Sequence, residues 1–387
     1  MYRGRWWEHM YKGIEGKIYP NRAQQRLINQ TFGHSRFVWN QMLAMLNTRY
    51  DNNPDAKLLS YNALSILLTQ LKKEYPWLKE VDAKALQNSV KTLREAFNRF
   101  FNKQSNYPRF KSGKIYKQTY KTLERTIRFN ANQRYIKLPK LGWVKCSMSL
   151  NDMNNDNITS VTVSRKSNNN YYISVLVESE NQALPKTEKA VGVDLGLTDL
   201  AITSDGVKYP SLYLHRKYKK QLHYWEKRLA RRRIQAKKDD KDLRYAKNYQ
   251  KARIQVAKLH QKMKDTRKDY LHKITTDLVE TYDVICIEDL KTSNMIKNHN
   301  LAQSIASQSW RMFRNMLAYK CLTYERELVV VNPYKTSQVC SSCGVETGKK
   351  PLRVRHFTCP TCHTQHDRDI NASKNIKNIG LGMSLSQ

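Results

Sequence analysis

The sequence predicts a multidomain protein of mixed α/β and α+β class, and three observations lead to that prediction. The chain has 387 residues, which is more than one hydrophobic core normally holds. Along the chain, the spacing of apolar residues changes from helical to alternating, and then to short strands mixed with helices. Four cysteines near the C-terminus form a separate metal-binding pattern. Apolar residues make up 40% of the chain, so packed cores are expected rather than general disorder.

The N-terminal part of the chain predicts one strand followed by a small helical bundle. Residues 12–20 read as a short strand that ends at Pro20, and Asn21 can cap the helix that follows. Ser60 can cap a second helix, and apolar residues at steps of three and four predict three amphipathic helices within 21–103. Because stripes of this kind usually form a core, they are not assigned to a ligand.

The next part of the chain has the period of two that is typical of strands. Apolar residues alternate on both sides of the turn-rich segment 166–170, which predicts a β-hairpin. Together with segments 12–20 and 126–150, this hairpin predicts a β-barrel-like domain that the helical bundle interrupts. The polar segment 181–189 contains a proline and is expected to be a linker.

The C-terminal half combines short apolar strands with helices. A turn signal at Asp205-Gly206 is expected to join two of the first three strands. The order of elements matches an RNase H-like layout, in which a mixed sheet carries acids at its strand ends and on the last helix. The expected strands lie near 190–193, 200–202, 207–209, 284–287 and 328–332, and the expected helices near 212–280, near 302–326 and from Asp369 onward.

The formal net charge of +36 indicates a polyanionic partner, and nucleic acid is the expected one. The sequence has no apolar run of about 18 residues, so no membrane span or membrane partner is expected. The N-terminus MYRGRWWEHMYKG has no apolar region typical of a secretion signal, so a cytoplasmic, nucleoid-associated protein of a prokaryotic cell is predicted.

The basic residues are concentrated in the long helical stretch. Residues 211–268 contain 21 Lys and Arg against five Asp and Glu, which suits a groove that follows a phosphate backbone. Interleaved Tyr and Trp would permit stacking on bases, but they could equally be the packed face of an antiparallel helix pair. A charge run is also usually a solvated helix face. A second basic segment is the loop 105–111. The candidate nucleic-acid contacts are Arg109, Lys111, Arg231, Arg232 and Arg233.

Three acids stand at strand ends and at a helix start in the C-terminal half. Asp194 follows the apolar VGV, Glu288 follows VICI, and Asp369 opens the last helix. Mg²⁺ prefers oxygen ligands, and two such ions about 3.5–4 Å apart steady the attacking and leaving oxygens in phosphodiester cleavage. The three residues are therefore the candidate catalytic and magnesium-binding set. A single acid at a strand end is commonly a cap or turn residue, and Asp367 is an alternative to Asp369.

The four cysteines have the spacing C-x2-C-x15-C-x2-C, which predicts one structural zinc ion held by four thiolates. A redox role for the CxxC pairs is the alternative, and the pairing of two such motifs argues against it. Histidines nearby could compete as ligands but are expected at the surface. The predicted ligands are Cys340, Cys343, Cys359 and Cys362, and the nearby histidines are His356, His363 and His366.

Taken together, these motifs resemble the TnpB family of RNA-guided nucleases encoded by insertion sequences, which are related to type V CRISPR effectors. The likeness covers nearly the whole chain, and the motifs follow one another in the family's order. The N-terminal segment IYPNRAQQRLINQTFGHSRFVWNQML, the basic YPRFK, the acidic VGVDLGLTDLA, ICIEDL and DRDINASKNI, and the cysteine segments TSQVCSSCG and CPTC carry it.

The resemblance implies a RuvC nuclease domain with Asp194, Glu288 and Asp369 as its acidic trio. It implies a guide RNA from the transposon end, recognition of a short motif beside a double-stranded DNA target, and cleavage of both strands by one centre, with a monomer binding the RNA. The implied domains are a β-barrel-like wedge domain at 1–20 and 104–182, a helical recognition bundle at 21–103, the nuclease domain at 189–335 and 366–387, and a zinc-ribbon insertion at 336–365.

Two rival functions remain open from the sequence. A nuclease-silent, RNA-guided or plain DNA-binding protein could serve as a repressor or transposition accessory, although such a protein would not need three acids. A DNA-cutting transposase that joins ends would instead give strand-joined products.

Overall fold

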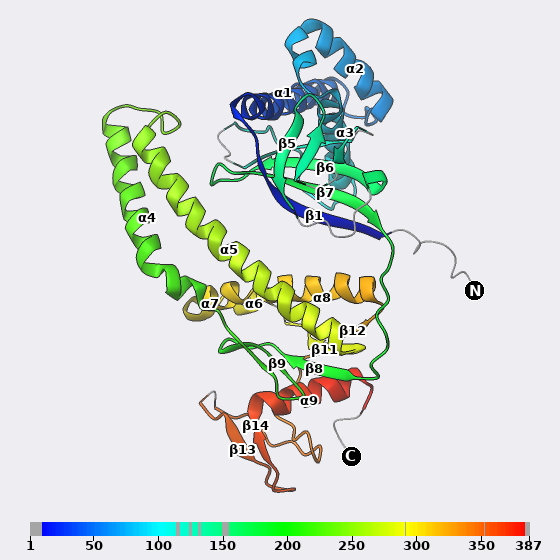
Figure 1. Cartoon of the computed structure of the whole chain (residues 1–387), viewed down its shortest axis with the longest axis vertical. Coiled ribbons are helices and arrows are strands. Elements are labelled where there is room, and N and C mark those ends of the chain that lie inside the picture. The colour runs from blue at the N-terminus through cyan, green and yellow to red at the C-terminus, as the bar shows by residue number, and fades with distance from the viewer. Residues whose placement is uncertain are drawn as a thin grey trace, which may run out of the picture. The chain divides into compact units, whose positions relative to one another are not determined.

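The computed structural model describes residues 10–113, 117–123, 126–130, 132, 134–148, 155–290, 292–351 and 353–383. The chain forms two compact units (Figure 1). Unit 1 combines Met1–Ser179 with Leu229–Ala257, and unit 2 combines Glu180–Arg228 with Lys258–Gln387. The finer division into four domains stays a prediction. The first nine residues, on which the expectation about secretion largely rests, lie outside the described residues.

Unit 1 contains the predicted strand and helical bundle, and both predicted caps are confirmed. Asn21 accepts a hydrogen bond from the backbone N–H of Gln24, whose side chain accepts one from the N–H of Asn21. Ser60 accepts from the N–H of Ala63. Apolar side chains from all three helices meet in one core. The elements are β1 (Met10–Tyr19), α1 (Arg22–Asn52), α2 (Tyr61–Glu74), the short 3₁₀ helix η1 (Pro76–Glu80) and α3 (Ala83–Phe101).

The sheet of unit 1 has seven strands in the order β2-β6-β7-β1-β5-β4-β3. The predicted hairpin is confirmed as β6 and β7, and β1 pairs with β7 and β5 from much later in the chain. The helical bundle thus interrupts the sheet, as predicted. Because β2 and β3 are the outer strands in this order, closure into a barrel stays a prediction. The bounds are β2 (Gln118–Thr122), β3 (Arg128–Phe129), β4 (Tyr135–Leu138), β5 (Gly142–Ser147), η2 (Asn155–Asn157), β6 (Ile158–Arg165) and β7 (Tyr171–Ser179).

The sheet of unit 2 has five strands in the order β10-β9-β8-β11-β12, with β11 parallel to both neighbours. All five strands were predicted, whereas the small β13–β14 sheet was not. The strands are β8 (Ala190–Asp194), β9 (Asp199–Thr203), β10 (Lys208–Pro210), β11 (Val284–Glu288), β12 (Glu327–Val331), β13 (His356–Thr358) and β14 (Gln365–Asp367).

Two of the predicted helices are each divided. The expected helix near 302–326 breaks at Ser309, whose backbone is left-handed with φ of 59°. The long basic stretch likewise forms two helices. The helices are α4 (Leu214–Lys238), α5 (Lys247–Thr281), α6 (Thr292–Met295), α7 (His299–Gln308), α8 (Trp310–Tyr324) and α9 (Arg368–Gly380). Within the described ranges, no helix has the length and apolar character required to cross a membrane.

Helices cover both faces of the five-stranded sheet (Figure 1). Val193 of β8 and Ile287 of β11 pack with apolar residues of α5 and α8 on one face. Cys286 packs with Val331 and with Ile376 of α9 on the other face. Because side chains alternate along a strand, every second residue of β8 and β11 faces α9.

Gly192 is the residue of β8 over which α9 passes most closely. A Cβ added there would lie 1.9 Å from the carbonyl oxygen of Ser373 and 2.5 Å from the backbone nitrogen of Lys377. Both atoms belong to the backbone of α9, so a side chain could be accommodated only if the helix moved. Glycine at this position therefore sets how near α9 lies to the sheet.

We expect Gly192→Ala to lower the free energy of unfolding of unit 2 by roughly 1–3 kcal/mol, the usual cost of overpacking. Thermal and denaturant unfolding would measure it. Gly13→Ala in β1 is the matched control, because a Cβ there meets nothing within 4 Å. Its effect should stay within about 0.5 kcal/mol. Equal stability of the two variants would contradict the close packing of α9.

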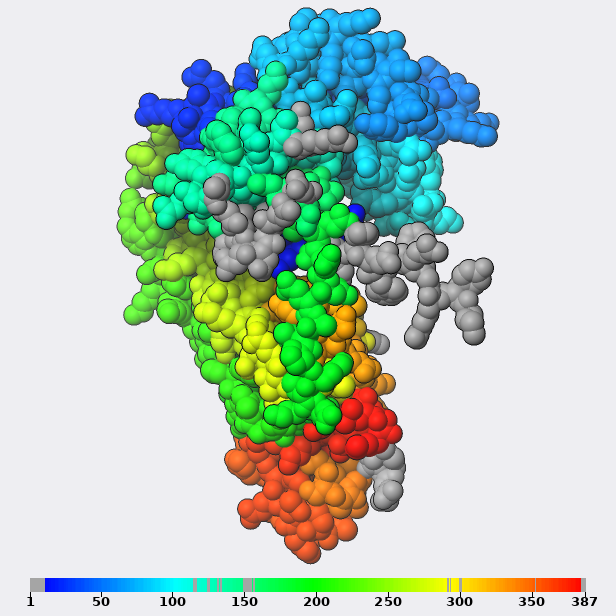
Figure 2. Space-filling view, turned by 45° about the vertical axis from the view of Figure 1, so that its right-hand side comes forward, coloured from blue at the N-terminus to red at the C-terminus, as the bar shows by residue number. Residues whose placement is uncertain are grey.

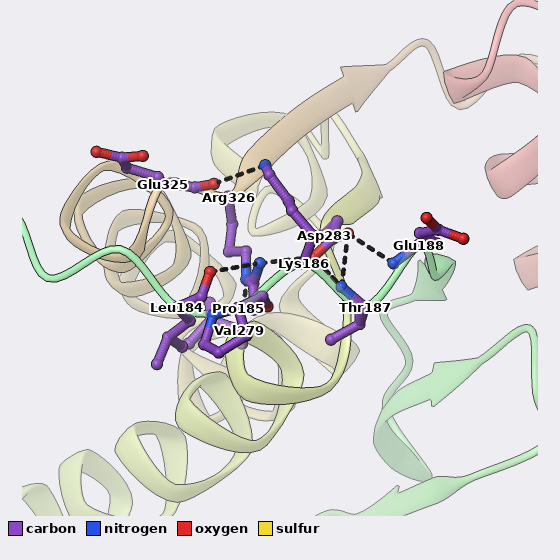
Figure 3. Close-up of polar contacts among 9 residues, drawn as sticks. All are labelled: Leu184, Pro185, Lys186, Thr187, Glu188, Val279, Asp283, Glu325 and Arg326. Carbon is purple, nitrogen blue, oxygen red and sulfur yellow. Dashed lines mark hydrogen bonds and ion pairs between the residues drawn. The ribbon is translucent and has the colours of Figure 1, made fainter.

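The predicted linker 181–189 is fastened to unit 2 (Figure 3). The buried Arg326 donates to the carbonyl oxygen of Pro185 over 2.8 Å and forms an ion pair with Asp283 at 2.5 Å. Asp283 in turn accepts a hydrogen bond from the backbone N–H of Glu188 over 2.7 Å. The segment leading into β8 is therefore held in place by a partly buried polar network centred on Arg326 and Asp283, unlike a free linker.

Candidate metal centres

The pairing of β8 with β11 places two of the predicted acids beside each other. The strands are parallel with Val193 opposite Ile287, so Asp194 and Glu288 follow at the carboxyl ends of neighbouring strands. Such strands lie about 4.8 Å apart. Val193 and Ile287 face α5 and α8. By alternation, Asp194 and Glu288 face the side of the sheet that α9 covers.

Asp369 reaches the same side of the sheet from the first turn of α9. This helix packs against both β8 and β11. The Oδ2 atom of Asp369 lies 3.1 Å from Nη1 of Arg355, whose side chain is about half exposed at 51%. All three predicted acids therefore lie on one side of the sheet.

Asp367, the alternative third acid, is the N-cap of α9. Its carboxylate accepts hydrogen bonds from the backbone N–H groups of Asp369 (2.9 Å) and Ile370 (3.2 Å), and from Nζ of Lys208 (2.6 Å). Burial acts to raise the pKa of Asp367, but these hydrogen bonds prevail and the pKa is lowered. Its carboxylate is thus engaged in starting the helix that carries Asp369.

The other two acids influence the ionisation of Asp194. Burial, together with the charges of Glu288 and Asp369, raises the pKa of Asp194 to about 8. Burial also raises the pKa of Glu288, and the Thr336 hydroxyl opposes this rise by donating to Oε1 over 2.6 Å. A buried carboxylic acid with a pKa raised in this way, such as Asp194, ionises more readily when positive charge lies beside it. The group therefore has the charge and ligand type that a divalent cation requires.

The carboxylate oxygens of the three acids lie farther from one another than the sulfurs of the four cysteines do. Among the residues that the structure describes, one group of three or more His, Cys, Asp or Glu side chains has all its ligand atoms within 4.8 Å of one another. That group consists of the four predicted zinc ligands. The carboxylate oxygens are thus set farther apart than the sulfurs.

A cavity of about 320 Å³ lies beside Glu288. Its wall includes Leu195 and Trp310, and two basic side chains of α8, Arg311 and Arg314. Arg314 also forms an ion pair with Asp289, the residue after the acid. Sequence reasoning did not single out these arginines, because nothing in the spacing of α8 places them at the end of β11.

The raised pKa of Asp194 predicts a dependence of stability on pH. An unfolded aspartate ionises near pH 3.9, whereas Asp194 keeps its proton up to about pH 8. Between these values the folded state binds more protons than the unfolded state, so Asp194 makes the protein less stable as pH rises. Without added divalent ions, Asp194→Asn should raise the Tm at pH 8 and have its smallest effect at pH 4.

The matched control for this prediction is Asp265→Asn, because Asp265 is an exposed residue of α5 in the same unit. Differential scanning calorimetry at several pH values would compare both variants with the wild type. A gain in Tm that is independent of pH, or equal in the two variants, would contradict a raised pKa at Asp194.

The four cysteines have the geometry of a closed zinc site. The Sγ atoms of Cys340 and Cys362 lie 3.7 Å apart, and those of Cys343 and Cys359 lie 3.6 Å apart. Sulfurs bound to tetrahedral zinc at about 2.3 Å are about 3.8 Å from one another. Gly344 supplies the left-handed turn after the first pair, with φ of 74°. The residues present therefore fit one structural zinc ion.

The segment that carries the four cysteines lies next to α9 within unit 2 (orange beside red in Figure 2), and β14 leads directly into that helix. His356 and His363 are exposed, as expected, but the expectation of a surface position was wrong for His366. It is buried, and its Nε2 lies 3.1 Å from Sγ of Cys340. His366 is opposite Phe357 in the β13–β14 pair, with 5.2 Å between the two ring centres, and this strand pair was not predicted.

Two of the candidate nucleic-acid residues, Arg109 and Lys111, lie on a loop that is docked on α1. The indole N–H of Trp39 donates to the carbonyl oxygen of Arg109 over 3.0 Å, and the backbone N–H of Lys111 donates to Asn40 over 2.8 Å. Nζ of Lys111 lies 3.6 Å from the centre of the Trp39 ring. Arg109 is exposed, and so are all three arginines of 231–233 in α4.

Three family models match parts of the chain. A "Probable transposase" model matches residues 172–299, and a "Cas12f1-like, TNB domain" model matches residues 310–376. A "Helix-turn-helix domain" model matches residues 10–54, where the structure has strand β1 and the long helix α1.

Curated relatives resemble the chain over almost its whole length. A protein of Streptomyces pristinaespiralis is 33% identical over 97% of this chain and 91% of its own. InsQ of Escherichia coli is 30% identical over 94% of this chain and 91% of its own. Both bear the name "Putative RNA-guided DNA endonuclease". The mimivirus "TnpB-like protein L79" is 32% identical over 33% of this chain and 25% of its own.

Among solved structures, the mini-RNA-guided endonuclease CRISPR-Cas_phi3 covers 98% of this chain and 94% of its own at 10% identity, with a TM-score of 0.42. The Cas12f1-sgRNA-target DNA complex covers 95% and 99% at 15% identity, with a TM-score of 0.34. TM-scores below 0.5 do not establish a shared fold.

Proposed function

The chain belongs to the TnpB family, and on that basis we propose that it is an RNA-guided DNA endonuclease. Its catalytic residues are Asp194, Glu288 and Asp369, in a RuvC-type, RNase H-like domain within unit 2. The observation that carries the proposal is electrostatic: burial, together with Glu288 of β11 and Asp369 of α9, raises the pKa of Asp194 at the end of β8.

The three acids would hold two Mg²⁺ ions, which supply the positive charge that phosphodiester hydrolysis requires at its attacking and leaving oxygens. Asp194 and Glu288 provide oxygens from neighbouring strand ends, and Asp369 provides them from the helix across. Thr336 fixes the orientation of Glu288 through its hydrogen bond. Burial and the neighbouring acids raise the pKa of Asp194, and a cation bound beside it would lower that pKa and release the proton.

Two arginines beside the acids are placed to bind DNA phosphates other than the scissile one. A DNA strand whose scissile phosphate lies at the acids has further phosphates along its backbone. Arg311 and Arg314 line the cavity next to Glu288, and guanidinium groups bind phosphate oxygens well. We assign to them the phosphates next to the scissile one.

The guide RNA supplies sequence by base pairing, while the protein holds the shape and backbone of the strands and reads a short motif beside the target. The net charge of +36 suits a protein that holds several polyanionic strands at once. Arg109, Lys111 and the arginines of 231–233 are assigned to backbone contacts. The proposal includes the four domains predicted from the sequence: the wedge domain, the helical recognition bundle, the nuclease domain and the zinc-ribbon insertion.

The test is to isolate the protein with its RNA, sequence that RNA, and incubate the complex with Mg²⁺ and plasmids. We expect a discrete RNA and linear plasmid when the target matches the guide and carries the flanking motif. A plasmid lacking the match should stay supercoiled. Occupancy of the matched site without cleavage under any divalent ion would instead support the nuclease-silent reading, and strand-joined products would support a transposase.

A further inference from the structure

One short segment of the chain joins the cysteine site to the acidic site. Residues 336–341 begin beside Glu288 and end at the first zinc cysteine pair. At one end, Thr336 donates its hydroxyl hydrogen to Oε1 of Glu288 over 2.6 Å. Both residues are buried, with exposed fractions of 5% and 8%. A buried hydrogen bond of this kind fixes the orientation of the acid that accepts it.

The same segment is clamped onto α9 by two buried asparagines. Nδ2 of Asn375 donates to the carbonyl oxygens of Thr336 and Val339, both over 2.8 Å. Nδ2 of Asn371 donates to Val339 over 2.7 Å, and its Oδ1 accepts from the N–H of Ser341 over 2.8 Å. The exposed fractions of Asn371 and Asn375 are 1% and 0%.

These bonds enclose Cys340, which lies between Val339 and Ser341 in the chain. They also reach the helix that carries Asp369 two residues before Asn371. The segment therefore contacts one acid directly through Thr336, the helix of a second acid through the asparagines, and the zinc ligands through its own backbone. A small cysteine loop of this type has too little core to stay ordered without its metal.

We propose that the zinc site and the acidic site are thermodynamically coupled through residues 336–341, with Thr336, Asn371 and Asn375 as positioning residues. Zinc at the cysteines orders the segment, which in turn holds Glu288 and α9 at the spacing that a divalent ion requires. This inference rests on the proposed function of the acids. By linkage, a divalent ion at the acids must equally strengthen the retention of zinc.

The coupling is expected to be sizeable. Changes in residues that hold a metal ligand in place typically weaken metal binding by about 10–100-fold. Thr336→Val removes the hydroxyl and preserves the shape of the side chain, so we expect Mn²⁺ to bind the acidic site about 10–100-fold more weakly. Thr336→Ser keeps the hydroxyl and should restore most of the affinity.

The experiment uses the RNA-free, full-length chain and measures free Mn²⁺ by electron paramagnetic resonance during titration. Asp194→Asn serves as the reference in which binding at the acids is lost. Thr323→Val is the matched control, because its hydroxyl donates to the carbonyl oxygen of Tyr319 within its own helix over 2.9 Å. Elemental analysis should give about one zinc per chain in every variant tested.

A second readout follows the zinc site itself. The rate at which a colorimetric chelator removes zinc should fall when Mn²⁺ is added to the wild type, and this protection should be largely lost in Thr336→Val. If Thr336→Val bound Mn²⁺ as tightly as the wild type and kept the protection, the coupling would be refuted while the nuclease proposal stood. If the wild type and Asp194→Asn bound the same amount of Mn²⁺ with the same affinity, the acids would not form a metal site and the proposed function itself would fail.

Discussion

Asp194→Asn is expected to reduce cleavage of a matched plasmid by about a thousandfold or more, which corresponds to a loss of about 4 kcal/mol of transition-state stabilisation. The substitution removes the carboxyl group that would ionise to hold a metal ion while preserving the shape of the side chain. Binding of RNA and of the matched duplex should be unchanged, because neither depends on this carboxylate. Gel-based cleavage assays and filter binding under the same conditions would separate the two effects.

The other acids sharpen this test. Glu288→Gln and Asp369→Asn should be as inactive as Asp194→Asn, whereas Asp367→Asn should still cut, since asparagine is also a good N-cap. Asp265→Asn, an exposed control in unit 2, should cut at the wild-type rate. An inactive Asp367→Asn together with an active Asp369→Asn would show that Asp367, and not Asp369, is the third catalytic acid.

Loss of zinc is expected to have the second largest effect. Cys340→Ser removes one of four thiolates, and structural zinc contributes about 10–16 kcal/mol of apparent folding free energy to small modules at pH 7. The segment 336–365 should therefore lose its order, and with it the support that Thr336 gives to Glu288. Zinc content should fall well below one per chain and cleavage should be lost.

Elemental analysis, plasmid cleavage and hydrogen exchange over residues 336–365 would measure these changes. Cys146→Ser, a buried cysteine in the sheet of unit 1, is the control that should keep its zinc. Full cleavage by a zinc-free Cys340→Ser protein would show that the zinc module supports neither the acids nor the substrate.

The elements that sequence reasoning predicted are those whose signals are local. The caps at Asn21 and Ser60, the hairpin around 166–170 and the apolar strands before Asp194 and Glu288 each depend on a few consecutive residues. The cysteine spacing is equally local, and the four sulfurs do lie together.

Features that depend on distant parts of the chain were not predictable in the same way. The neighbouring positions of Asp194 and Glu288 follow from the parallel register of β8 and β11, which the sequence does not encode locally. The position of His366 opposite Phe357 depends on the pairing of β14 with β13. The helix predicted near 302–326 is broken at Ser309, where the sequence has no glycine or proline that would predict a helix end. The bond from Thr336 to Glu288 joins two segments that no motif connects.

The most direct test of the acidic centre is anomalous scattering from crystals grown with Mn²⁺. We expect peaks at the manganese edge between the carboxylates of Asp194, Glu288 and Asp369, with all three residues within bonding distance of an ion. A peak held by other residues, or a map in which Asp369 remains apart from the ions, would contradict this expectation.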